Sequence, residues 1–178
     1  MERIPLREHP YLFDKVVQRI QRALGDSLVW LDYAFGLAER ITRVIDGKKF
    51  TLPNLWVGGN EYIDLMPDQM RGSFAFCYLD EPQKKADGRM RGCIQMIVWW
   101  DTRNIDAELR DMERVKSQVL DALGRVAGVE VVEIYDRPAS IYKGFTFDET
   151  VSCALMHPFA GIRVAMDVYV EPDCNPYV

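Results

Sequence analysis

The chain has few cysteines and histidines, and this scarcity excludes several kinds of site. Its 178 residues include four cysteines and two histidines. The cysteines have no spacing typical of a metal or redox motif, and three of them lie in apolar stretches, where a free thiol packs as a small hydrophobe. We therefore expect a reducing compartment, no disulfide framework, no metal ion and no cofactor. The four are Cys77, Cys93, Cys153 and Cys174.

Long apolar runs and basic clusters are missing as well. No stretch approaches the roughly 18 apolar residues that a membrane-spanning helix needs. Residues 1–10 carry several charges and no apolar core, so they do not resemble a signal peptide. The 22 basic and 27 acidic residues give a net charge of −5, whereas nucleic-acid binding usually requires a basic face. The sequence predicts a cytoplasmic protein without a membrane or nucleic-acid partner.

What remains is the composition of one ordinary globular domain. Apolar residues make up 48% of the chain and charged residues 28%, and we find no repeat and no linker. We therefore treat residues 1–178 as a single domain. The polar stretch 80–91 is predicted to be a flexible loop, and residues 171–178 a tail.

Apolar spacing predicts two helices. The first runs from Pro10 to Leu24, with an apolar residue at every fourth position, and Gly25 is expected to end it. The second covers 104–127, with Asn104 as its N-cap and Gly128 closing it. Its apolar residues recur at steps of three and four.

The clearest local signal is a β-hairpin. Asp46-Gly47 separates two strand-like segments, 41–45 and 48–52, and a two-residue Asp-Gly loop favours a type I′ turn. That register pairs Ile45 with Lys48. Pro53 cannot donate to a ladder, so the second strand should be an edge or should end there. Basic side chains on both strands are typical of a protected edge, and we expect the hairpin to project from the body.

Alternating apolar residues predict further strands at 73–79, 93–100, 129–135 and 163–170, while 139–153 could be helix or strand. Because Trp99 and Trp100 are adjacent in one strand, they should point to opposite faces of the sheet. Short connections favour antiparallel pairing. The fold class is therefore α+β: a mainly antiparallel sheet with a protruding hairpin, and helices packed on one face.

The residues with catalytic chemistry do not form a recognisable set. His9 and His157 are expected in surface or turn positions. Cys153 lies four residues from His157, but it reads as a buried strand residue, and no third residue is evident to orient the histidine. The carboxylates at Asp106 and Glu108 suit the first turn of a helix, where negative charge is stabilising. The sequence therefore predicts no active site.

The order of these elements resembles that of the tail-terminator and tail-completion proteins of long-tailed bacteriophages and prophages. The matching pieces are 10–24, the hairpin 41–52, the strand 93–101 with the helix that follows it, and 163–170. The resemblance implies a non-enzymatic, virion-associated subunit of a homo-oligomeric ring, with tail or head-connector proteins as partners. The residues expected at the contact are Arg40, Thr42, Arg43, Asp46, Lys48, Lys49 and Trp56.

Two other functions stay open at this point. One is a monomeric binding or regulatory module of unknown ligand, which predicts a discrete apolar groove. The other is a small enzyme using His157 and Cys153 or the helix carboxylates, which predicts a deep pocket where those side chains converge.

Overall fold

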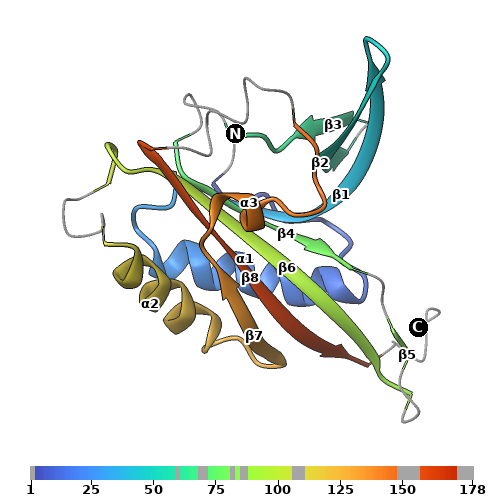
Figure 1. Cartoon of the computed structure of the whole chain (residues 1–178). Helices are drawn as coiled ribbons and strands as arrows, with labels where there is room; N and C mark the ends of the chain where they lie inside the picture. Colours follow the sequence, from blue (N-terminus) through green and yellow to red (C-terminus); the bar gives the residue numbers. More distant parts are fainter. Residues whose placement is uncertain are drawn as a thin grey trace.

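A single eight-stranded sheet runs through the molecule and holds its other elements in place (Figure 1). The computed structural model describes residues 3–58, 61–67, 72–80, 83–84, 88–105, 111–147 and 157–171. The strand order is β3-β2-β1-β4-β6-β8-β7, with β5 pairing to β6. The pairs are antiparallel except for β1 with β4, which is parallel. The strands are β1 (Tyr33–Ile45), β2 (Lys48–Gly58), β3 (Glu61–Asp64), β4 (Phe74–Leu79), β5 (Gln83–Lys84), β6 (Met90–Asp101), β7 (Val129–Tyr135) and β8 (Phe159–Val170).

Two helices cover one face of this sheet, as the sequence predicts. They are α1 (Phe13–Ser27) and α2 (Met112–Leu123). Their apolar stripes, which include Val16 of α1 and Val119 of α2, pack on buried residues of β6 and β8. The fold is therefore an α+β arrangement with a mainly antiparallel sheet, and the predicted fold class is confirmed.

The opposite face carries an aromatic cluster. Phe74, Phe76 and Tyr78 of β4 lie beside Trp99 of β6, and all are buried. The short helix α3 (Pro138–Ile141) and the turn after it cover this cluster. Trp100 lies in the core beneath α1 and α2, so the two tryptophans do point to opposite faces.

The predicted ends of the first helix are wrong. The helix begins at Phe13 instead of Pro10, and it continues through Gly25 to Ser27. Gly25 serves a close contact instead of a helix end, because a Cβ there would lie 2.3 Å from Cδ1 of Ile4. The N-terminal segment thus packs directly on the helix backbone, which the sequence pattern of the helix alone does not reveal.

The predicted start and end of the second helix are also wrong. The α-helix begins at Met112, where Asp111 is the N-cap and its carboxylate accepts a hydrogen bond from the Glu113 N–H at 3.0 Å. Asn104 lies in a bend after β6, and 106–110 fall outside the described residues. The helix ends at Leu123, and Gly128, with φ of 82°, precedes β7 instead.

Two smaller expectations also need correction, and two others lie partly outside the described residues. The segment predicted as a loop, 80–91, contains the strand β5 and the start of β6, while 81–82 and 85–87 fall outside the described residues. Within the ambiguous stretch 139–153, α3 is helical and 148–153 are not described. The last strand begins at Phe159, before the predicted Arg163. Of the predicted tail, residues 172–178 lie outside the described part of the chain.

Tyr142 provides a test of the packing on the aromatic face. It is 5% exposed, burial raises the pKa of its phenol, and its hydroxyl finds no hydrogen-bond partner among the described residues. A Tyr142→Phe variant is expected to raise the free energy of unfolding by about 1 kcal/mol, because it removes a buried unsatisfied group and keeps the ring. Urea denaturation would measure the change. A lower stability in the variant would show that the hydroxyl is bonded.

Candidate interaction surface

The tip of the predicted hairpin, formed by the ends of β1 and β2, projects beyond the other strands of the sheet (Figure 1). We call this hairpin the arm and define it as Glu39–Ile45 of β1 with Lys48–Asn54 of β2, which pair antiparallel. β1 pairs with β4 only from Tyr33 to Ala38, so the arm continues past the sheet without that neighbour. Both strands of the arm consequently have exposed faces.

The turn at the end of the arm has the predicted geometry. Asp46 has φ of 50° and Gly47 has φ of 75°, as a type I′ turn requires at both positions. Ile45 pairs with Lys48. The predicted register is therefore confirmed, residue by residue, along the whole hairpin.

Pro53 does not end the second strand of the arm, which continues to Gly58. Pro53 pairs with Arg40, a position where the missing N–H would point away from β1. Beyond it, β3 pairs with β2 from Asn54 to Gly58, so this half of β2 is not an edge. The expectation of an edge holds for the tip of the arm alone, where the structure describes no strand beside Lys48–Leu52 and a single backbone bond, from the Thr146 N–H to the Thr51 carbonyl at 2.9 Å, reaches this side among the described residues.

Two arginines that were expected at a contact are engaged within the chain. Arg40 lies 3.5 Å from the Asp80 carboxylate and stacks over the Tyr78 ring at 5.7 Å. Arg43 donates to the Asn54 side chain at 2.9 Å and pairs with the carboxylate of Asp64, the last residue of β3, at 3.3 Å. Both arginines therefore brace the base of the arm against the sheet.

The residues at the tip are free for a partner. Lys48 and Lys49 are exposed and make no ion pair within the described part of the chain. Asp46 is exposed in the turn, and Thr42 shares a 3.0 Å hydroxyl contact with Thr51 across the strands. The tip thus presents two unpaired cations.

Trp56 lies apart from the tip, at the base of the arm. It pairs with Tyr62 of β3, and its ring is 40% exposed with the Arg7 guanidinium 5.2 Å from its centroid. The structure therefore divides the predicted contact residues into three groups: braces, tip residues and this tryptophan.

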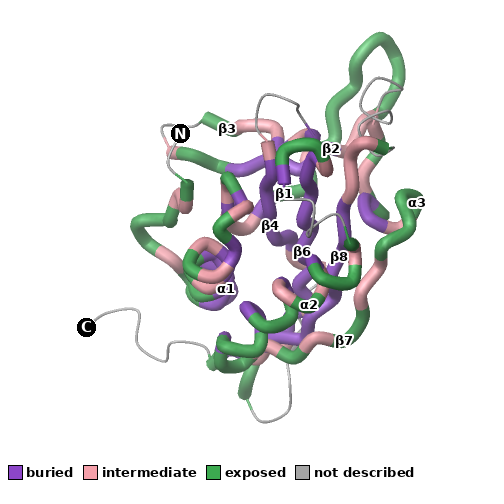
Figure 2. Tube along the Cα trace, turned by 90° about the vertical axis from the view of Figure 1, so that its left-hand side faces the viewer, coloured by how far each residue is buried: buried purple, intermediate pink, exposed green. Residues whose placement is uncertain are grey.

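Exposed apolar side chains gather on the same part of the molecule, whose upper end is drawn largely as exposed in Figure 2. Among the described residues, ten large hydrophobic side chains are exposed, and five of them belong to β1, β2 and β3. They are Val44, Ile45, Trp56, Val57 and Tyr62. Apart from Trp56, sequence reasoning missed them, because an apolar residue in a strand-like segment does not show whether the face it occupies is covered or lies in water.

A hollow of about 390 Å³ lies beside the tip of the arm. Its apolar lining is formed by Ile45, Phe50, Leu52 and Met66, and its charges come from Asp46, Lys48 and Asp64. The hollow gives one face of the arm both apolar surface and charge, a combination typical of protein contacts.

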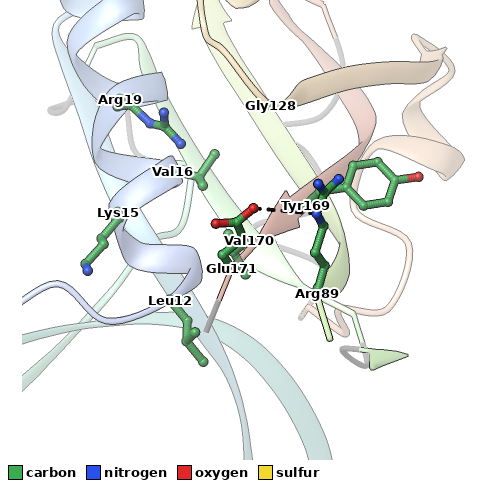
Figure 3. A pocket seen from close by; sticks show the side chains of 9 residues that line it. All are labelled: Leu12, Lys15, Val16, Arg19, Arg89, Gly128, Tyr169, Val170 and Glu171. Atoms are coloured by element: carbon green, nitrogen blue, oxygen red, sulfur yellow. Dashed lines mark ion pairs between the residues drawn. The ribbon is translucent and has the colours of Figure 1, made fainter. Parts of the chain in front are cut away.

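A second cavity, of about 640 Å³, lies between α1 and the end of β8 (Figure 3). Lys15 and Arg19 of α1 are among its lining residues, as are Arg89 and Glu171, which pair at 3.6 Å. The side chains of Arg89 and Glu171 are 54% and 81% exposed, so water screens this pair. Of the residues considered for catalysis, His9 and His157 are described, and neither lines this cavity.

Of the residues considered for catalysis, the structure describes the two histidines. His9 and His157 are both exposed, as predicted, and His157 lies in a turn. Cys153, Asp106 and Glu108 fall outside the described residues. Within the described part, Cys77 and Cys93 are free thiols, and no group of three potential metal ligands occurs. Burial raises the pKa of Cys77 to about 12 and also raises that of Cys93, so neither is an activated thiol.

Sequence reasoning also missed a buried polar network beneath the base of the arm. Arg163 of β8 is 6% exposed, and it donates to the Ser140 carbonyl at 2.7 Å and to Oε1 of Gln95 at 3.0 Å. Gln95 in turn donates to Asp80, the carboxylate that pairs with Arg40. The alternation of β8 places Arg163 on the more polar face of that strand, but it does not show that this face is covered.

No protein-family model matches the chain, and no curated protein matches its sequence. Within the described residues, no helix has the length and apolar character needed to cross a bilayer. The arguments for function therefore rest on the arm and on the order of the elements.

Proposed function

We propose that the protein is a non-enzymatic structural subunit that assembles with copies of itself, as the phage tail-terminator and tail-completion proteins do. Its order of elements resembles theirs. Under this proposal the assembly is a ring, and tail or head-connector proteins are its further partners. The observation that carries the proposal is the arm, which places apolar side chains and unpaired cations beyond the body of the fold.

An arm of this kind lowers the stability of a chain that remains a monomer. A two-stranded ribbon in water is at best marginally stable, and its open edges invite pairing with other chains. Val44 is 66% exposed and Ile45 is 49% exposed at the tip. Covering these side chains in an assembly would recover the hydrophobic free energy that the isolated chain forgoes.

The bracing of the arm supports the same proposal. Arg40 and Arg43 fix its base to β4, β2 and β3, so the arm is held in one direction while its tip stays free. A rigid projection loses little conformational entropy when it docks, and this favours specific assembly.

A shortened arm tests this function. Replacing Val44–Lys49 with Asp-Gly would close the hairpin at the pair Arg43 and Phe50, which has the same hydrogen-bonded character as the native pair Ile45 and Lys48. The native protein is expected to form an oligomer, and the shortened protein a monomer of about 20 kDa, because the exposed tip is gone and both braces remain. Light scattering after size exclusion would measure both masses.

The thermal midpoint of the shortened protein serves as the control, and it should stay within a few degrees of the native value. A native protein that remains a strict monomer at the highest attainable concentration, even with a tail protein present, would overturn the proposal.

A further inference from the structure

We propose that the arm of one copy adds as a strand to the free edge of β7 in the next copy. This inference rests on the proposed function and names the surface that receives the arm. It makes the contact heterologous: two different edges of the same sheet meet, and every copy offers one of each.

The β1 side of the arm is an open edge. Ile45 and Lys48 close a two-residue loop as a hydrogen-bonded pair. Because hydrogen-bonded and non-hydrogen-bonded pairs alternate along the ladder, Arg40, Thr42 and Val44 occupy non-hydrogen-bonded positions relative to β2. Their backbone N–H and C=O groups therefore point away from β2. Within the described residues, no strand or loop pairs with this side of the arm beyond Ala38.

The second open edge is the outer side of β7. This strand is the last in the sheet order, and it pairs on its other side with β8 (Figure 1). The described structure shows no backbone partner for its outer edge. β7 spans seven residues, with a register shift between Val131 and Glu133 in its pairing with β8, and the open part of β1, Glu39–Ile45, covers seven positions of the hairpin register. The two edges thus match in length.

Charge makes the two edges complementary to each other and not to themselves. The open β1 strand carries Glu39 and the internally engaged Arg40 and Arg43, and the exposed cations Lys48 and Lys49 lie beside it on β2, whereas β7 carries two acidic residues, Glu130 and Glu133, and no basic one. Both glutamates are exposed. Pairing arm with arm or β7 with β7 would place like charges together, which is unfavourable across strands. Pairing arm with β7 brings opposite charges together.

Apolar side chains are available on both edges. Val44 on the arm is 66% exposed, and Val132 on β7 is 61% exposed. Strand addition would bring apolar side chains from the two copies onto a shared sheet, where cross-strand contacts stabilise pairing. The same surfaces explain why each edge carries charge: a monomer needs protection from unspecific pairing, and charge also selects the partner.

The position of the edges then determines the kind of assembly. β7 ends the sheet on one side, and the arm extends from the other side of the strand order. Each copy therefore receives an arm at one end and offers an arm at the other. Repetition of this contact produces a ring if the rotation closes and a filament if it does not.

A mixing experiment tests the contact. One variant carries Lys48→Glu with Lys49→Glu, which makes the arm acidic, and the other carries Glu130→Lys with Glu133→Lys, which makes β7 basic. Each variant alone is expected to be a monomer of about 20.6 kDa, because its arm and its β7 edge then bear the same sign of charge. Mixed in equal amounts, the two should recover the native mass, because each arm again meets an edge of opposite charge.

A matched control changes the net charge without touching either edge. Arg19→Glu with Arg22→Glu reverses two exposed cations of α1 and should leave the native oligomer intact.

A backbone test complements the charge-reversal experiment. Thr42→Pro removes an N–H on the open edge, at a position equivalent to the tolerated Pro53, and should abolish assembly, whereas Thr42→Ala should not.

The outcomes separate this inference from the function on which it rests. A native protein that is a monomer overturns the proposed function. If the native protein is an oligomer, two results would show that the arm does not pair with β7. One is that either charge-reversed variant alone keeps the native oligomeric mass; the other is that the mixture of the two variants fails to recover that mass. In both cases the oligomeric function still stands.

Discussion

A Trp99→Ala variant is expected to lose about 3–5 kcal/mol of the free energy of unfolding. Trp99 is 1% exposed, and its ring stacks on Phe74 at 5.4 Å and on Phe159 at 5.1 Å between centroids. Alanine would leave a cavity between β4, β6 and β8, where paired strands on both sides limit collapse of the neighbouring residues. The loss therefore includes both the transfer of the indole and the cavity it leaves.

Chemical denaturation followed by circular dichroism would measure this loss, and Trp56→Ala provides the matched control. Trp56 is 40% exposed, so its replacement should change stability by less than about 1 kcal/mol. If the two variants lost equal stability, the aromatic face would not be the close-packed core described above.

The register of the arm could be predicted from sequence because its determinants are local. Asp46-Gly47 favours one turn type, and that turn fixes every pair from Ile45 with Lys48 outward. The strand at Phe74–Leu79 was equally accessible, since a strand that is apolar on both faces indicates burial on both sides. In such segments the pattern and the structure depend on the same few neighbours.

The ends of the helices were not predictable in this way. Gly25 lies inside α1 because Ile4 approaches its backbone, a contact between segments more than 20 positions apart. Asp111 instead of Asn104 caps α2, and both residue types are good caps, so local propensity could not distinguish them. A tertiary contact decided the first case, and in the second the sequence offered two equally suitable caps.

The candidate surface shows the same division. The position of the arm followed from the turn, but the roles of its arginines did not. Arg40 and Arg43 resemble the tip lysines in sequence, and it is the carboxylates of Asp80 and Asp64 that hold them in place. A charged residue on a projecting strand can therefore be a brace or a contact, and only its distant neighbours tell the two apart.

Replacing Arg163 should have the second large effect, a loss of about 3 kcal/mol for Arg163→Met. The guanidinium satisfies the Ser140 carbonyl and the Gln95 side chain, and it lies 4.0 Å from the centroid of the Tyr135 ring. Methionine fills much of the same volume but leaves those acceptors unpaired in a buried site. An unsatisfied buried acceptor costs more than its hydrogen bond contributes.

Arg163→Lys is the informative companion, because it keeps the charge and loses the planar fork that serves two acceptors at once. Its stability should fall between those of the native protein and Arg163→Met, as urea denaturation would show. The network continues through Gln95 and Asp80 to Arg40, so both variants should also loosen the base of the arm. Faster amide exchange at Glu39–Ile45 would report that loosening, and unchanged exchange there would show that the arm is held independently of Arg163.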